Sequence, residues 1–298
     1  MFFFVYLHLN HGIVAGPRGL SPQVGTGHEK DLQVQTMSHE LDINKTLEQL
    51  LEPLEPITLE QMSEIRLMNR TDTKFVTNKA KLAELLKLAQ GHYYAQFNAG
   101  SKIATYRTTY WDTDLHDFYM DHHNGRSPRQ KVRVRTYMDS GVTFLEIKTK
   151  NNHGRTKKKR VEVPAQGQIA EQEAFLQEKV HRGVSDIHET VQNNFHRITL
   201  VNYGKTERLT IDFDVSFHNY ETGQDIATGD LVIIELKRDG NVYSPVLELL
   251  RQLRIKPSGF SKYCIGSVMT NPGLKQNLFK PKLKKISKRV GPTFPWNV

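Results

Sequence analysis

The residues best suited to chemistry lie in the segment Lys131–Tyr137, which reads Lys-Val-Arg-Val-Arg-Thr-Tyr. Lys131, Arg133 and Arg135 alternate with β-branched residues, and this period of two predicts a β-strand with its cations on one face. Guanidinium groups bind phosphate oxygens in pairs and ammonium groups add point charge, so such a face is suited to a phosphate ligand. For a single strand, a solvated outer face is the simpler interpretation. The functional interpretation therefore depends on whether the pattern recurs.

The pattern recurs on other predicted strands, where charged residues again alternate with aliphatic ones. These charged residues are Glu146, Lys148, Lys150, Glu235 and Lys237. In an open sheet they would form a wet face, whereas in a closed barrel covered by helices they would line the interior. An interior so rich in cations would repel itself and be costly to desolvate unless an anion occupied it. Phosphate chains fit this description.

The elements that must position these residues are about eight strands, mostly antiparallel because their connections are short. We predict them at residues 70–77, 104–112, 131–137, 143–150, 156–163, 197–203, 208–215 and 231–237. Helices are expected at 41–54, 58–68, 78–90, 168–194 and 245–253, and a polar loop at 121–130. The predicted fold class is α+β: an eight-stranded antiparallel β-barrel with helices packed outside.

Composition narrows the function classes. The 298 residues include 41 Lys and Arg against 32 Asp and Glu, a net charge of +9. This balance favours a polyanionic partner, namely nucleic acid, a phosphate compound or an acidic membrane surface. The single cysteine, Cys264, excludes an internal disulfide and a Cys-rich zinc site and fits a reducing compartment. Neither a Walker loop nor a Gly-x-Gly-x-x-Gly after a strand occurs, so the common nucleotide-binding folds are unsupported.

The chain is expected to divide into three parts. Residues 1–56 are predicted to form a disordered leader and a short helix, residues 57–270 the folded domain, and residues 271–298 a mobile basic tail. The sequence contains no apolar run of the roughly 20 residues that a membrane-spanning helix needs. A cytoplasmic protein is the resulting expectation.

Six motifs, in this order, resemble the catalytic domain of the vacuolar transporter chaperone (VTC) polyphosphate polymerases, which are CYTH-like triphosphate tunnel metalloenzymes. The resemblance covers roughly residues 66–268. The motifs are Arg70-Thr-Asp-Thr-Lys74-Phe, Tyr110-Trp-Asp112, Lys131-Val-Arg133-Val-Arg135-Thr-Tyr, Phe144-Leu-Glu146-Ile-Lys148-Thr-Lys, Ile234-Glu235-Leu-Lys237 and Phe260-Ser261-Lys262-Tyr. The resemblance implies an eight-stranded antiparallel tunnel.

The resemblance also implies roles for individual residues. Glu235 matches the position that holds a divalent metal, manganese or magnesium. The residues that match positions binding the nucleotide's triphosphate or the growing chain are Lys74, Arg133, Arg135, Lys148 and Lys262. Further phosphate-binding candidates are Arg70, Lys131, Lys150, Lys158, Arg160, Lys205, Lys237 and Ser261, where Lys205 stands in place of an arginine common in the family.

One departure from the wider superfamily bears on function. Its first strand often carries Glu-x-Glu-x-Lys, with both glutamates binding metal, whereas this sequence has Arg70, Asp72 and Lys74. The difference leaves Glu235 as the main metal ligand and agrees better with the polymerases than with the triphosphatases.

The implied function is a metal-dependent phosphotransferase that moves the γ-phosphate of ATP onto a growing polyphosphate chain and releases ADP. Alternatives are a tunnel triphosphatase, which hydrolyses tripolyphosphate or a nucleotide, and a polyphosphate-binding module without turnover. Nucleic-acid binding rests on charge alone, and no recognition motif supports it. The membrane helices of eukaryotic relatives do not appear in this sequence, so the resemblance indicates a bacterial-type stand-alone form with a separate membrane-protein partner.

Simpler roles are expected for the other polar candidates. Glu235 has an alternative role as an ion-pair partner of Lys237, and Asp112 is expected to orient an arginine rather than bind metal. The residues expected to be supporting, solvated or packed are Asp212 and Asp214 beside the binding residues, His122 and His123 in the polar loop, and Cys264 as a packed thiol.

Overall fold

The computed structural model describes residues 45–63, 65, 70–164, 169–181, 183, 186–240 and 242–296. The predicted disordered leader lies outside these residues. Of the helix expected at 41–54, residues 45–51 are helical. None of the helices in the described ranges combines the length and apolar character needed to cross a bilayer.

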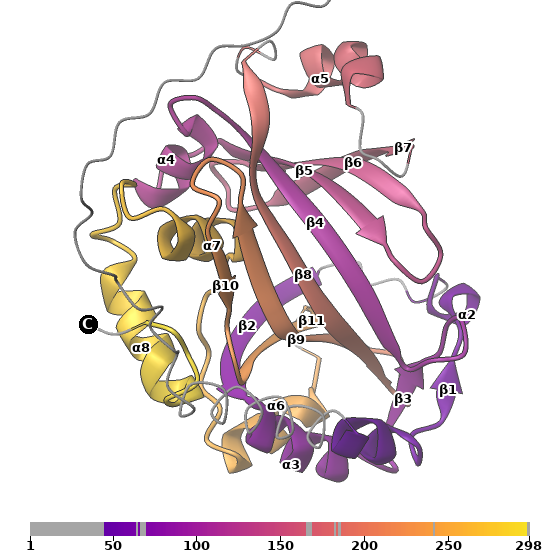
Figure 1. The fold of residues 1–298 in the computed structure, drawn as a ribbon. Helices are drawn as coiled ribbons and strands as arrows, with labels where there is room; N and C mark the ends of the chain where they lie inside the picture. The colour runs from indigo at the N-terminus through magenta and orange to yellow at the C-terminus, as the bar shows by residue number, and fades with distance from the viewer. Residues whose placement is uncertain are drawn as a thin grey trace, which may run out of the picture. The chain divides into compact units, whose positions relative to one another are not determined.

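All eight predicted strands are present and pair antiparallel in one sheet (Figure 1). In sheet order they are β2 (Arg70–Asn78), β11 (Leu231–Asp239), β9 (Glu207–Asn219), β8 (Ile187–Asn202), β4 (Ile103–Thr113), β5 (Arg129–Tyr137), β6 (Thr143–Lys150) and β7 (Thr156–Val163). Three short strands are attached to this order: β1 (Pro56–Ile57), β3 (Tyr93–Gln96) and β10 (Asp225–Ala227). The predicted α+β class with an eight-stranded antiparallel sheet and helices is confirmed. The sheet is a curled half-barrel, since no described pairing joins β2 to β7.

One face of the sheet, here called the outer face, is covered by helices and is apolar. Helices α3 (Lys79–Ala89) and α6 (Pro245–Gln252) share a buried cluster with β8, β9 and β11 that includes Leu82, Leu250 and Ile234. Asn78 begins α3, because its side chain accepts a hydrogen bond from the amide of Lys81. The remaining described elements outside the sheet include α2 (Leu59–Ser63), the 3₁₀ turn η1 (Ala170–Gln172) and α5 (Glu173–Lys179).

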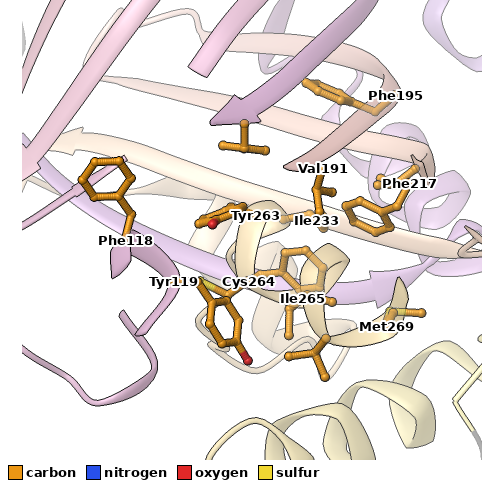
Figure 2. Close-up of a cluster of buried hydrophobic side chains, with 14 of the residues drawn as sticks. Phe118, Tyr119, Val191, Phe195, Phe217, Ile233, Tyr263, Cys264, Ile265 and Met269 are labelled. Carbon is orange, nitrogen blue, oxygen red and sulfur yellow. The ribbon is translucent and has the colours of Figure 1, made fainter. Parts of the chain in front are cut away.

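The opposite face, here called the inner face, is partly covered by α7 (Lys262–Thr270). Figure 2 shows Tyr263 of this helix next to the sheet, and Ile265 and Met269 belong to the same buried cluster as Val191 and Phe217 of the sheet. Gly266 permits the close approach, because a Cβ there would lie 2.4 Å from the Phe217 ring. Helix α7 thus covers one part of the inner face, next to the part that carries the charged side chains.

Three sequence-based expectations are wrong. The helix expected at 168–194 ends at Lys179, and residues 187–194 belong to β8, where pairing with β4 and β9 outweighs local helical spacing. Part of the expected polar loop is α4 (Asp117–His123). The expected mobile tail contains α8 (Lys280–Val290), whose Leu283, Ile286 and Val290 are buried on one side.

Candidate functional site

The inner face gathers the basic residues that the alternation singled out. Strand register places Lys131 opposite Lys148 and Lys148 opposite Lys158, while Glu235 lies opposite Lys74. Residues directly opposite one another point to the same face of a sheet. We call the resulting set the cationic face; it comprises Lys74, Lys131, Arg133, Arg135, Lys148, Lys150, Lys158, Arg160, Arg197, Lys237 and, from α7, Lys262.

Glu146 is a fixed counter-charge on this face. It is fully buried, and its Oε2 accepts from Arg133 Nε at 2.8 Å while its Oε1 accepts from Lys158 Nζ at 2.9 Å. Burial alone would raise the pKa of Glu146, but the charges of Arg133 and Arg135 hold it well below its usual range. Because both oxygens are occupied, Glu146 orients Arg133 and has little capacity left for a ligand.

Arg197 and Asp212 form a second fixed pair that sequence reasoning missed as binding machinery. Arg197 donates to both oxygens of Asp212, from Nε at 2.6 Å and from Nη2 at 2.9 Å, and Lys262 also bonds this carboxylate. The Arg197 guanidinium lies over the rings of Tyr106 and Phe195, at 5.0 and 5.3 Å from their centroids. The sign of this role that the sequence offered was the position of Arg197 as the first residue of the predicted strand 197–203.

Glu235 is held less tightly than the other two carboxylates. Its oxygens lie 3.2 Å from Lys237 Nζ and 3.6 Å from Lys74 Nζ, and 23% of its side chain is exposed. Burial alone would raise the pKa of Glu235, but Lys237 and Lys74 outweigh it and keep the carboxylate ionised.

The donor set around Glu235 limits which metal could bind. Among the described residues no group of three or more His, Cys, Asp or Glu side chains could hold an ion. A closed protein cage is therefore not formed by these residues. Magnesium-type ions are commonly bound through one or two carboxylates with phosphate oxygens and water as the other ligands. Glu235 fits that arrangement and is the residue that would hold the ion.

The cationic face carries more positive charge than its carboxylates balance. The charge of Arg133, then burial and Arg135, lower the pKa of Lys148 to about 5. Burial lowers the pKa of Lys262 to about 7 despite Asp212. Within the described part of the chain, Lys131, Arg135 and Lys148 have no carboxylate within 4.0 Å. An anion bound here would stabilise the charged forms of these side chains.

Some of the predicted phosphate-binding residues lie away from the cationic face or are held in hydrogen bonds and ion pairs within the protein. Arg70 is exposed at the start of β2, where its Nε lies 2.7 Å from Asp72 Oδ1. Lys205 is exposed in the turn between β8 and β9, and Arg197 of the preceding strand is the cation on the inner face. Ser261 accepts from the amide of Cys264 at the start of α7 and from Lys131 Nζ, at 2.9 Å for the latter.

The expected role of Asp112 is wrong. Its carboxylate accepts hydrogen bonds from the backbone amides of Thr113, Phe118 and Tyr119, each at 2.8 Å, and from the hydroxyl of Tyr263. No arginine is among these partners. Asp112, near the end of β4, instead caps the first turn of α4 and joins this helix to α7, because it satisfies donors that the first turn of a helix leaves free.

The two histidines of the expected loop are also placed differently. His123 is buried on α4, and the Nδ1 atom of His122 is buried without a hydrogen-bond partner in the described structure. The two imidazole rings are shielded from solvent because the ring of Phe279 packs against them. Its centroid lies 5.5 Å from that of His123 and 6.2 Å from that of His122. Cys264 is fully buried on α7 among Tyr263, Ile265 and Phe217, which confirms the packed thiol.

Comparison with known proteins gives one family and a set of similar folds. The family model described as the VTC domain matches residues 69–271. No curated protein matches the chain. A putative adenylate cyclase from Bacillus halodurans is 13% identical, with 65% of this chain and 96% of that one covered and a TM-score of 0.44. A putative adenylyl cyclase from Hippeastrum, described as having a dominant triphosphatase activity, is 15% identical over 68% of this chain and 97% of that one, with a TM-score of 0.44.

Proposed function

This chain belongs to the VTC domain family, and on that premise we propose that it is a polyphosphate polymerase. It transfers the γ-phosphate of ATP to the end of a polyphosphate chain and releases ADP. The observation that carries the proposal is the cationic face, where basic side chains from both halves of the sheet and from α7 converge. Phosphoryl transfer needs chiefly positioning and charge stabilisation, which such a face can supply.

The proposed reaction needs no covalent intermediate with the protein. A terminal oxygen of the acceptor phosphate attacks the γ-phosphorus, and the bond between that phosphorus and the β–γ bridging oxygen breaks, so ADP leaves with the electron pair. Arg133 is oriented by Glu146, and Arg197 and Lys262 by Asp212, so these cations are preorganised to bind phosphate oxygens. Arg135 adds charge that the described carboxylates do not pair, and Lys148 adds more once phosphate binding has protonated it. A manganese or magnesium ion held by Glu235 would offset charge on the oxygens of the transferring group.

Product analysis tests the proposal. The protein is incubated with ATP and manganese, and phosphate polymers are resolved on a gel. A polymerase produces long chains together with ADP. Release of inorganic phosphate without polymer would instead identify a triphosphatase, and binding of polyphosphate without consumption of ATP would identify a binding module.

Polyphosphate affinity should fall steeply as salt concentration rises. Several lysine and arginine contacts to phosphate each release counterions, as for polyanionic nucleic acids, where log K falls with log salt by about 0.7–0.9 per neutralised phosphate. Titrations at low and high salt measure the slope. An affinity that does not change with salt would contradict phosphate-dominated binding.

Triphosphate binding should take up a proton at Lys148. The pKa of this side chain is about 5 in the free protein, so it is uncharged at neutral pH. Bound phosphate favours the ammonium form and raises the pKa, hence affinity falls as pH rises above about 5, by about tenfold per pH unit for one proton. The fall ends once the pH exceeds the pKa in the complex.

The variant Lys148→Arg tests this coupling, because arginine stays charged. At pH 8 it should take up about one proton fewer than the wild type on binding tripolyphosphate. Calorimetric titration in buffers of different ionisation enthalpy gives the proton count, and the ligand's own protons contribute equally to both proteins. Equal proton uptake by the two proteins would remove Lys148 as the titrating group.

A further inference from the structure

Five basic side chains meet at the end of the inner face beside α4 and α8. We call them the α8-end cluster: His122 of α4, Arg129 and Lys131 of β5, Lys150 of β6 and Lys282 of α8. Arg129 lies directly opposite Lys150 in the β5–β6 pairing, so both point to the inner face. Lys131 Nζ lies 2.9 Å from Ser261 Oγ at the start of α7. The cluster therefore continues the cationic face beyond Arg133.

Helix α8 holds Lys282 at this place. The buried Leu283 and Ile286 anchor the helix, and Lys282 Nζ lies 5.8 Å from the centroid of the Phe279 ring. The same ring lies 6.2 Å from the ring of His122. A Cβ at Gly259, in the segment before α7, would lie 3.8 Å from Lys282 Nζ. Lys282 thus stands next to both α4 and the segment that leads into α7.

No described carboxylate balances the α8-end cluster. Arg129, Lys131, Lys150 and Lys282 have no Asp or Glu within 4.0 Å among the described residues, and Asp121 of α4 lies 3.6 Å from Arg126. Burial and then the charges of Lys131, Arg129 and Lys282 lower the pKa of His122 far below its usual range. Half-buried cations without a counter-charge repel one another, and a bound anion would relieve that repulsion.

The length of the combined surface indicates what kind of anion fits. Arg135 and Arg129 are six residues apart on β5, which at about 3.3 Å per residue is roughly 20 Å. A ligand that touches both ends must be a chain longer than a triphosphate. Lys282 also lies outside residues 69–271, so the family match does not assign it a role.

We propose that the α8-end cluster binds the distal phosphate units of a linear polyphosphate, beyond those held around Arg133 and Arg135. This inference rests on the proposed function. In this proposal, helix α8 is part of the polymer-binding surface. The α8-end cluster should therefore discriminate between long chains and triphosphates.

The test compares two ligands and three variants of the full chain. Lys282→Glu should weaken binding of a long polyphosphate about tenfold while leaving the affinity for tripolyphosphate within about twofold, since screening at physiological salt confines the change to roughly 8 Å. Arg129→Ala, on a different element, should show the same selectivity. Lys284→Glu is the matched control, because Lys284 is exposed on the same helix and outside the cluster.

Each outcome has a definite meaning. Unchanged polyphosphate binding by Lys282→Glu and Arg129→Ala, in variants with wild-type melting temperatures, would overturn the inference. So would equal weakening of both ligands, or an equal effect of Lys284→Glu. Loss of binding to anionic phosphatidylserine vesicles, with polyphosphate binding intact, would identify a lipid surface instead. If the wild type binds long polyphosphate yet makes none, the proposed polymerase fails while this binding site stands.

Discussion

Glu235→Gln is expected to abolish metal-dependent turnover of ATP and to leave polyphosphate binding intact or slightly tighter. Glutamine keeps the volume of the side chain but loses the charge that recruits a divalent cation. Loss of a metal's charge stabilisation at the transferring phosphoryl group should cost several kcal/mol of barrier, on the order of a thousandfold in rate or more. The cations of the inner face need no metal to bind polyphosphate, so binding should remain. The substitution also removes one negative charge from among these cations, and binding could therefore become slightly tighter.

The measurement pairs ATP turnover in manganese with polyphosphate binding, in a variant shown to be folded by its melting curve. Glu248→Gln is a matched control, since Glu248 lies on α6 against the outer face and its side chain is 54% exposed. Turnover near the wild-type rate would remove Glu235 as the metal ligand. Joint loss of folding and binding would favour the structural ion pair with Lys237, 3.2 Å away.

The largest loss of stability is expected from Asp112→Ala. This change leaves three backbone amides and the Tyr263 hydroxyl without their acceptor in a fully buried place. Each unsatisfied buried group costs about 1–3 kcal/mol, so the free energy of unfolding should fall by roughly 4 kcal/mol or more. For a chain of this size the melting temperature should drop by about 10 °C or more.

Tyr263→Phe supplies the scale for this experiment, because it removes one of the four donors and should cost about 1 kcal/mol. Denaturant unfolding of both single variants and the double variant gives the coupling between the two side chains. An Asp112→Ala protein with wild-type stability but without phosphate binding would show that the carboxylate serves the site and not the packing of α4 against α7.

The sequence by itself determined the eight strands and the direction of the side chains on β5, β6 and β11. The two faces of a strand follow from a period of two, which is a local property. Arg133 and Lys148 could therefore each be assigned to the charged side of its own strand before any pairing was known. The same locality explains the failures. The segment 187–194 reads as helix until β4 and β9 supply its partners. Leu283, Ile286 and Val290 of α8 form a buried helix face only because the rest of the fold supplies a surface that covers them.

Tertiary structure decided which charges neutralise one another, apart from Glu235 and Lys237, which are two residues apart on β11. Arg197 and Asp212 meet across the β8–β9 pairing and are joined by Lys262 from α7, whereas Lys205, a phosphate-binding candidate implied by the family resemblance, lies in an exposed turn. Asp112 and Tyr263 are far apart in sequence, so no local pattern could assign that carboxylate to a helix start instead of an arginine. Charge interactions depend on distance and burial, and both are set by the curling of the sheet and the packing of α7 and α8 onto it.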